Sequence, residues 1–190
     1  MLCRNVLHVL KRISVMCSPG DEYLSFLNEA GCDPGVIEHC RVVRDVAVRI
    51  ASDITGAGRI VDTQLVAAGA ILHDIGRSRT HGMGHADEGG IICRSLGFDE
   101  PLCRIVERHI GAGLQADERA GFGLSAVDRI PETLEEKIVA HADNLVKGTR
   151  VISDEEFKSS LERFDEPIRE RFLALANELE RLKTPDPESS

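Results

Sequence analysis

Four polar residues stand in segments that are otherwise apolar, where a polar side chain needs a partner. His39 lies early in a long amphipathic segment. His73 and Asp74 end the most apolar segment of the chain, and Asp143 interrupts the apolar run 138–146. A carboxylate buried alone is costly, so it implies a partner. A divalent cation bound by two imidazoles and two carboxylates would satisfy all four residues, and such mixed ligation suits Mn, Fe, Co, Ni, Zn or Mg.

Each of these residues also has a simpler explanation. A single helical histidine such as His39 is more often a hydrogen-bonded or surface group than a ligand. Asp143 could pair with Lys147 one helical turn later, and Asp74 could close the turn at Gly76. Because spacing across a hundred residues is a weak signal, the residues alone leave both a metal site and a plain helical bundle open.

The segments that carry these residues have the sequence signals of helices. Asp33-Pro34 is typical of a helix start, and apolar residues then recur at helical spacing as far as Gly56. A second helix begins at Asp62 or Thr63 and is apolar on every side, which predicts burial at the centre of a bundle.

Further helices are expected over residues 85–96, 99–109, 133–146, 153–161 and 165–182. Two of them open with a capping box, Thr133 with Glu136 and Ser153 with Glu156. The segment 111–131 is expected to be mostly loop, with a short turn near 124–129. No segment alternates β-branched and polar residues, so the predicted fold class is all-α, with about seven to nine helices.

A chain of 190 residues and 20.8 kDa fits one hydrophobic core. We expect an N-terminal extension over residues 1–20, a helical domain over 21–183 and a disordered tail over 184–190. Residues 1–16 are too short to span a bilayer and lack a cleavage site, and no function is assigned to them. Six cysteines without a Cys-x-x-Cys pair predict reduced thiols and a cytoplasmic protein.

Composition narrows the partners. The formal net charge of -9 repels polyanions, so neither a nucleic acid polymer nor a membrane is expected as a partner, whereas a small phosphorylated ligand remains compatible. With no Trp, one Tyr and six Phe, there are few rings on which a base could stack. Recognition of a nucleobase is therefore expected to be modest.

The string His73-Asp74-Ile75-Gly76, at the end of a helix of small apolar residues, resembles the HD-domain superfamily of metal-dependent phosphohydrolases and its small stand-alone members with an HDIG motif. The resemblance covers roughly residues 33–150. The order H…HD…D of that family falls on His39, His73, Asp74 and Asp143. It implies an HD-type helical bundle whose His and Asp residues hold metal.

Many members carry two further histidines, and His85 and His109 match their usual placement. His81 is expected in a mobile loop, and His141, two residues before Asp143, on another helix face. The resemblance then implies one or two divalent metals, with Asp74 between them and orienting a water that attacks phosphorus. A helix-start role for His85 and a cation at a helix end for His109 remain alternatives.

Arg77 and Lys147 are candidates for holding the phosphate, although either could be a solvated surface charge. The resemblance implies a hydrolase of a phosphate ester or anhydride of a small molecule, a nucleotide or dinucleotide. The oligomeric state stays open between a monomer and a homodimer. A metal- and nucleotide-binding regulatory protein without turnover is the alternative, and a di-iron oxygenase is a more remote one. The Gly-Tyr-Pro signature of the cyclic-di-GMP branch is absent from the sequence.

Overall fold

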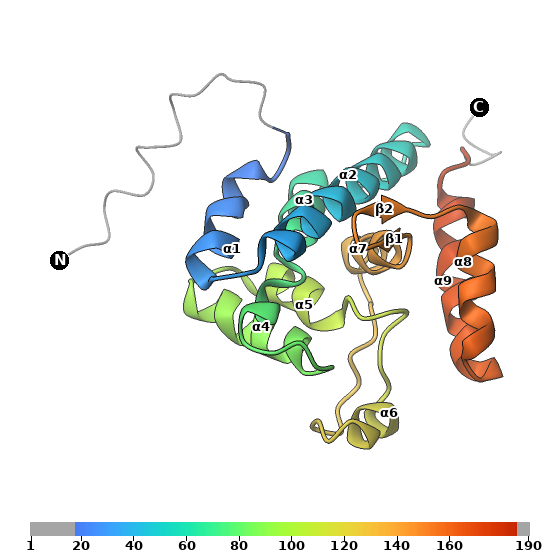
Figure 1. The fold of residues 1–190 in the computed structure, drawn as a ribbon. Helices are drawn as coiled ribbons and strands as arrows, with labels where there is room; N and C mark the ends of the chain where they lie inside the picture. Colours follow the sequence, from blue (N-terminus) through green and yellow to red (C-terminus); the bar gives the residue numbers. More distant parts are fainter. Residues whose placement is uncertain (1–17, 186–190) are drawn as a thin grey trace.

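The computed structural model describes residues 18–185, and these residues are mainly helical (Figure 1). The α-helices are α1 (Leu24–Ala30), α2 (Pro34–Gly56), α3 (Thr63–Leu72), α4 (His85–Ser95), α5 (Glu100–Arg108), α6 (Ala116–Gly121), α7 (Leu134–Asn144), α8 (Asp154–Ser160) and α9 (Glu166–Leu182). Short 3-10 turns are η2 (Asp21–Tyr23), η3 (Ile75–Ser78) and η4 (Leu161–Arg163). The all-α prediction is confirmed. The predicted extension and tail fall largely outside the described residues.

Helix starts follow the capping signals in the sequence. The Asp33 carboxylate accepts a hydrogen bond from the backbone N–H of Gly35 at 2.8 Å, with Pro34 at the first helical position of α2. Both predicted capping boxes form, at the starts of α7 and α8. These side chains satisfy N–H groups that a helix start leaves without partners.

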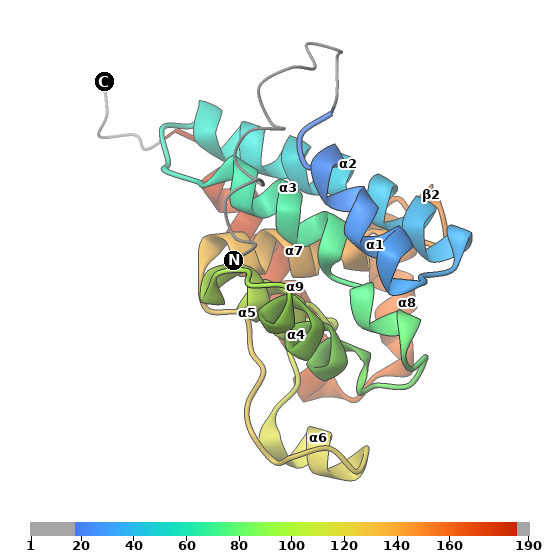
Figure 2. The same ribbon diagram turned by 90° about the vertical axis from the view of Figure 1, so that its left-hand side faces the viewer.

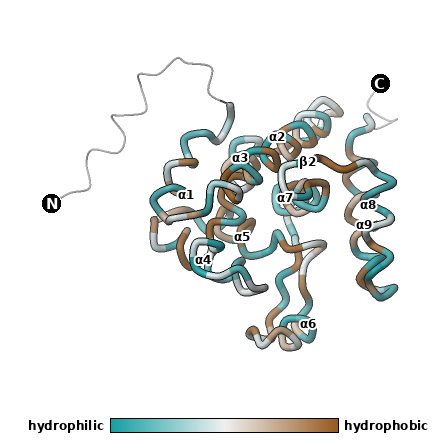
Figure 3. Tube along the Cα trace, viewed as in Figure 1, coloured by the Kyte–Doolittle hydropathy of each residue, from teal (hydrophilic) through white to brown (hydrophobic). Residues whose placement is uncertain are grey.

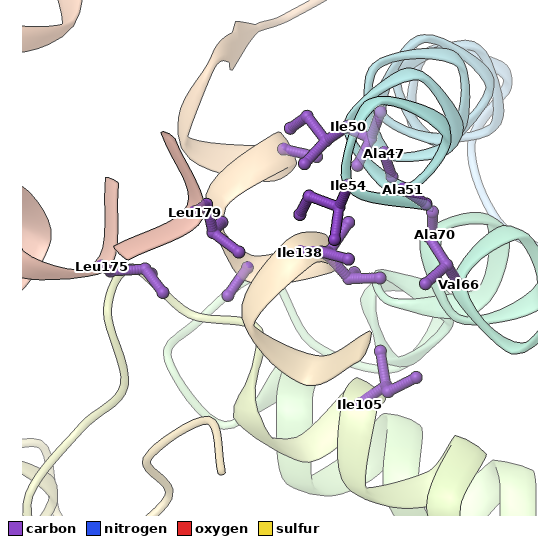
Figure 4. Packing of buried hydrophobic residues seen from close by; sticks show 14 of the residues in the cluster. Ala47, Ile50, Ala51, Ile54, Val66, Ala70, Ile105, Ile138, Leu175 and Leu179 are labelled. Atoms are coloured by element: carbon purple, nitrogen blue, oxygen red, sulfur yellow. The ribbon is translucent and has the colours of Figure 1, made fainter. Parts of the chain in front are cut away.

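Helix α3 lies at the centre of the bundle, in contact with α2, α5 and α7. Every residue from Val66 to Leu72 is buried, as its all-round apolar sequence predicts. Aliphatic side chains from five helices form the main core (Figure 4), among them Ile50 and Ile54 of α2, Val66 of α3, Ile105 of α5, Ile138 of α7 and Leu179 of α9. Hydropathy alternates along the outer helices α2 and α9 (Figure 3), as expected where one face packs and the other is solvated.

The predicted helix 133–146 is two residues too long. Helix α7 ends at Asn144, and the chain then forms the antiparallel hairpin β1 (Val146–Lys147) and β2 (Arg150–Val151). Gly148 lies in the turn with φ +61°, a conformation that glycine adopts without strain. Two-residue strands are too short to produce an alternating pattern, which is why the sequence analysis missed the hairpin.

The segment 111–131 is mostly loop, as predicted, and the backbone N–H of Val127 donates to the Ser125 carbonyl in a tight turn. It also contains the short helix α6 (Ala116–Gly121), which was not predicted. In both views α6 stands away from the main bundle (Figures 1 and 2). A buried arginine attaches it: Arg119 donates to the Asp87 carboxylate of α4 at 2.8 Å and to the Ser125 carbonyl at 3.1 Å.

Turn η3 and helix α4 pack at backbone contact. A Cβ placed on Gly76 would lie 1.9 Å from the carbonyl oxygen of His85 and 2.5 Å from the backbone nitrogen of Gly89. Only glycine fits there, and the contact brings the segment after His73-Asp74 against the start of α4. Within residues 18–185, no helix is both long and apolar enough to cross a bilayer.

Candidate metal centre

Six side chains from five parts of the bundle converge beside α3. They are His39 in α2, His73 at the C-terminal end of α3, Asp74 just before η3, His85 at the start of α4, His109 at the end of α5 and Asp143 in the last turn of α7. The four imidazoles form a continuous row. Ring centroids are 5.3 Å apart for His39 and His73, 4.9 Å for His73 and His109, and 5.1 Å for His85 and His109.

Each imidazole is oriented by a backbone carbonyl on its Nδ1 side. The rings of His73, His85 and His109 each reach the carbonyl three residues earlier, at 2.8, 2.8 and 2.7 Å. The ring of His39 instead reaches the carbonyl of Gly148 in the hairpin turn at 2.7 Å. Since a carbonyl oxygen only accepts, Nδ1 carries the proton in all four rings, and in the neutral ring Nε2 presents a lone pair.

The Nε2 atoms fall into two groups around the two carboxylates. In the first, Asp143 Oδ1 lies 3.0 Å from His39 Nε2 and 3.6 Å from His73 Nε2. In the second, Asp74 Oδ1 lies 3.2 Å from His85 Nε2 and 3.6 Å from His109 Nε2. The other oxygen of Asp74 lies 3.7 Å from His73 Nε2, so this carboxylate stands between the two groups.

The donor atoms fit a cation better than they fit one another. His85 Nε2 and His109 Nε2 lie 3.1 Å apart, and two lone pairs at that distance repel unless a positive charge lies between them. His73 Nε2 and Asp74 Oδ1 are buried and have no hydrogen-bond partner in the described structure. Two sets of three could each hold a metal ion, His39 with His73 and Asp143, and His73 with Asp74 and His109. Nitrogen and carboxylate donors in this number suit divalent transition metals.

The electrostatics keep both carboxylates ionised. Burial opposes the charge on Asp74, but the imidazoles of His73, His109 and His85 outweigh it and hold the pKa of this carboxyl well below its usual range. Desolvation likewise opposes the charge on Asp143, but the imidazoles of His39, at 3.0 Å, and His73, at 3.6 Å, outweigh it and lower the pKa of this carboxyl below the usual range. Both residues therefore present anionic oxygens to a cation.

The two candidate phosphate-binding residues have different surroundings. Arg77 donates from Nε to Asp74 Oδ2 at 2.6 Å and from Nη1 to the His81 carbonyl at 3.4 Å, so its guanidinium is attached to the centre itself. Lys147, in β1, is exposed and pairs with Arg150 of β2, and its side chain makes no hydrogen bond or salt bridge in the described part of the chain. Asp143 does not pair with Lys147, the simpler explanation offered for it, because it contacts His39 and His73 instead.

The other two histidines lie outside the centre. His81 lies in the exposed turn before α4. The ring of His141 packs edge-on against Phe157, with 5.6 Å between ring centroids. Because His141 is two residues before Asp143, it lies on another face of α7. Desolvation lowers the pKa of His141 to about 4, so it is a neutral packing residue.

Comparison with known proteins agrees with this arrangement. The HD domain profile matches residues 36–148, which is more than half of the chain. The chain belongs to the HD-domain family. An uncharacterized protein of Methanocaldococcus jannaschii is 48% identical over 154 residues, covering 80% of this chain and 91% of that protein.

This HD-domain chain also resembles part of a larger enzyme. A tRNA (cytidine(56)-2'-O)-methyltransferase of Picrophilus torridus is 46% identical over 133 residues, which are 70% of this chain but 38% of that enzyme. Among solved structures, the HD domain of the Listeria monocytogenes phosphodiesterase PgpH aligns with a TM-score of 0.52 and 16% identity, covering 84% of this chain and 99% of that domain. Its complex with cyclic-di-AMP aligns with a TM-score of 0.53. At this identity the likeness shows the fold.

A cavity of about 680 Å³ lies next to the candidate metal centre of this HD-domain protein and includes Asp143 and Lys147 in its lining. Its other walls come from the segment 110–122, the end of α7 and the segment 157–172. The cavity is within the size range of small-molecule sites. Sequence reasoning did not find it, because its residues come from loops and helices that share no motif.

Sequence reasoning also missed an ionic network behind the second group of ligands. Glu107, two residues before His109, pairs with Arg94 at 2.7 Å and Arg129 at 3.1 Å. Asp87, two residues after His85, pairs with Arg119 at 2.8 Å. The network joins α4, α5 and the segment around α6. The only sign of this network in the sequence was a carboxylate two residues from His85 and another two residues from His109.

Proposed function

We propose that this protein hydrolyses a phosphate ester or anhydride of a small molecule, with a nucleotide as the substrate class. The observation that carries the proposal is the convergence of four Nε2 atoms and two ionised carboxylates, with His73 Nε2 and Asp74 Oδ1 buried and without partners. Such a donor set is unfavourable without a cation. Membership of the HD-domain family supports a metal-dependent phosphohydrolase.

The six residues hold one or two divalent ions in this proposal. His39, His73 and Asp143 form one subsite, and His85 and His109 form the other, with Asp74 shared between them. Bound divalent ions would supply an activated water and neutralise charge on the phosphate. Asp74 orients that water, and Arg77 holds the Asp74 carboxylate in place through its 2.6 Å hydrogen bond.

Lys147 binds the phosphate in this scheme. Its side chain makes no hydrogen bond or salt bridge within residues 18–185, although its charge helps to lower the pKa of Glu156, and Lys147 lines the cavity together with Asp143. A phosphate oxygen is a strong acceptor for such a donor. The Listeria phosphodiesterase domain and its cyclic-di-AMP complex support a nucleotide as the class of substrate.

A second candidate is a metal- and nucleotide-binding regulatory unit without turnover. The match to a tRNA methyltransferase of which this chain spans 38% favours it, since an HD unit joined to another enzyme could act as its sensor. The complete set of six ligands favours turnover, because a regulatory unit has no need of both subsites.

One experiment separates the two candidates. The protein is purified without chelator, its metal content is measured by elemental analysis, and phosphate release is followed with Mn, Co, Ni and Mg. The panel holds nucleoside monophosphates, cyclic dinucleotides, dinucleoside polyphosphates and a 3′-phosphorylated RNA oligonucleotide. Asp74→Ala is the matched control.

Metal-dependent release by the wild type that Asp74→Ala abolishes supports the hydrolase. Tight nucleotide binding without release under any metal supports the regulatory unit. Absence of metal from the wild type, together with absence of binding and release, rejects both.

A further inference from the structure

The cavity beside the metal centre gathers most of the aromatic side chains of the chain. Phe122, Phe157, Phe164 and Phe172 line it, which are four of the six phenylalanines in the sequence. The low aromatic content therefore does not mean that rings are absent from the place where a ligand would bind. The prediction of modest nucleobase recognition rested on the number of rings, and the structure concentrates them.

Local packing fixes the inner rings of this aromatic cavity. Phe164 and Phe172 are stacked, with ring centroids 5.3 Å apart and planes 16° apart. The Arg163 guanidinium lies 4.6 Å from the Phe164 ring centroid. Gly111, with φ +62°, lets Phe172 approach the backbone, because a Cβ there would be 2.7 Å from the Phe172 ring. The inner wall is thus preformed.

The outer wall contains a ring without such packing. Phe122 follows α6, is 55% exposed and lines the cavity. A large apolar side chain costs free energy in water, and this one is held at the cavity by the Arg119 attachment described above. Exposed aromatic faces next to a cationic, metal-binding end are the arrangement that base stacking uses.

The ends of the cavity differ in chemistry. Asp143 and Lys147 stand at the metal end, whereas Leu161, Ile168 and the phenylalanines form an apolar wall. Ser160, Asn144 and three charged side chains, Glu118, Arg163 and Arg171, also line the cavity. Glu118 and Arg171 pair with each other at 2.6 Å, and Arg163 lies over the Phe164 ring, so these charges already have partners in the chain. A mostly apolar, aromatic wall with a small number of polar groups is typical of a pocket that orients a flat heterocycle.

We propose that this cavity binds the planar base of a nucleoside monophosphate whose phosphate lies at the metal end, and that Phe122 stacks on the base. The proposal rests on the proposed function and adds the part of the substrate that gives specificity. Base stacking on an aromatic side chain is commonly strong enough to change affinity by about tenfold. Phe122 is then a specificity-determining residue for this site.

The test compares each nucleotide with a substrate that has the same phosphate and the same sugar but no base. The four ribonucleoside 5′-monophosphates are each compared with ribose 5-phosphate, which lacks only the base, and n-hexyl phosphate tests an apolar chain without a ring. The wild type is expected to prefer its best nucleotide to ribose 5-phosphate by at least about tenfold in kcat/KM. Phe122→Ala is expected to reduce that ratio to within about twofold of unity, chiefly through KM for the nucleotide.

Ile60→Ala is the control, because Ile60 is 96% exposed and does not line the cavity. It should keep the wild-type ratio, and thermal unfolding of each variant checks that it folds. A wild-type ratio near unity overturns the proposal, as does an equal loss on both substrates in Phe122→Ala. Hydrolysis of n-hexyl phosphate as efficient as that of the best nucleotide also overturns it.

A second readout keeps this proposal separate from the proposed function. If the metal-loaded protein hydrolyses none of the substrates, the phosphohydrolase proposal fails. Calorimetry then measures binding of the nucleotides and of ribose 5-phosphate to the same protein. Tighter nucleotide binding that Phe122→Ala removes supports the aromatic cavity, and equal binding of nucleotide and ribose 5-phosphate overturns it.

Discussion

Each of the four imidazole rings of the candidate metal centre is oriented by a hydrogen bond between its Nδ1 atom and a backbone carbonyl. Three of these carbonyls lie three residues earlier in the same segment as the ring, so local helical geometry places them. His39 differs, because its carbonyl belongs to Gly148, 109 residues away. Its orientation therefore depends on the hairpin, and fixed rings lower the cost of assembling the site when metal binds.

We expect His85→Ala and His39→Ala to weaken metal binding at different subsites. Each substitution removes one nitrogen donor, which should reduce affinity at that subsite by at least about 100-fold. Elemental analysis should show one ion lost in each variant if the protein binds two. His81→Ala is the control, because His81 lies outside the centre, and loss of metal from it would contradict this assignment.

Arg77 and Lys147 should respond differently to loss of charge. Lys147→Met should raise KM for a phosphate ester by about tenfold or more with metal content unchanged, since a charged hydrogen bond to phosphate is lost. Arg77→Met should instead lower kcat, because Asp74 loses the partner that holds it. Steady-state kinetics with elemental analysis of both variants distinguishes these roles, and identical kinetic effects would argue against them.

The candidate ligand residues could be predicted from the sequence more completely than the residues that contact them. The His73-Asp74 doublet and the four outlying residues follow from motif order and helix context. Neither the contact of Arg77 with Asp74 nor the contact of His39 with the Gly148 carbonyl could be predicted. The partner of a side chain depends on how the elements pack.

The helices and turns position the centre through very close contacts. Turn η3 lies against α4 so tightly that Gly76 has no room for a side chain. This contact connects the segment carrying Asp74 with the helix that His85 begins. Sequence punctuation predicted these helices and their caps well, because capping is local. It did not predict α1, α6 or the hairpin, and α1 packs on α2, α3 and η3.

Gly76→Ala should destabilise the protein by about 3 kcal/mol or more, since the new methyl group forces backbone atoms apart. It should also lower the metal content, because His85 would move away from Asp74. Chemical denaturation and elemental analysis measure the two effects. Gly56→Ala is the control: nothing lies within 4 Å of a Cβ at that helical position, and a small gain in stability is expected there.

Removal of the Arg119 side-chain charge should release the segment around α6. Arg119→Met removes the hydrogen-bonded partner of the Asp87 carboxylate and leaves only the more distant Arg129, at 3.7 Å. Breaking a buried pair costs about 3–5 kcal/mol. Hydrogen exchange should show lost protection in residues 111–131, or the unfolding midpoint should fall. Arg150→Met, which breaks an exposed pair with Glu156, should leave both measurements unchanged. Equal behaviour of the two variants would be evidence against the attachment.

Over the whole molecule, the six candidate metal ligands come from five parts of the bundle and span residues 39 to 143. A cation bound there would connect α2, α3, α4, α5 and α7, so metal binding and global folding would be linked. The aliphatic core and the number of helices could be predicted from composition and periodicity. The gathering of phenylalanines around one cavity could not, since composition gives how many rings exist and never where they meet.

Chelation should lower the thermal unfolding midpoint. Removing an ion that binds the native state at 100 times its Kd costs about 2.7 kcal/mol, which corresponds to a shift of roughly 5–10 °C for a chain of this size. Calorimetry with and without chelator measures the shift. Asp74→Ala should abolish the difference between the two conditions, because its two carboxylate oxygens lie beside His73 and His85 and both proposed subsites share it. An unfolding midpoint that is the same with and without chelator in the metal-loaded wild type would contradict the linkage between metal binding and folding.

The Arg119–Asp87 contact has a consequence for how two ligands affect each other. It connects the segment bearing Phe122 to α4, two residues after His85. In the proposed scheme, this contact would connect a nucleotide stacked on Phe122 with an ion bound at His85, and we expect a coupling free energy between the two binding events. Thermodynamic reciprocity then requires that, by whatever factor the ion tightens nucleotide binding, the nucleotide tightens retention of the ion by the same factor.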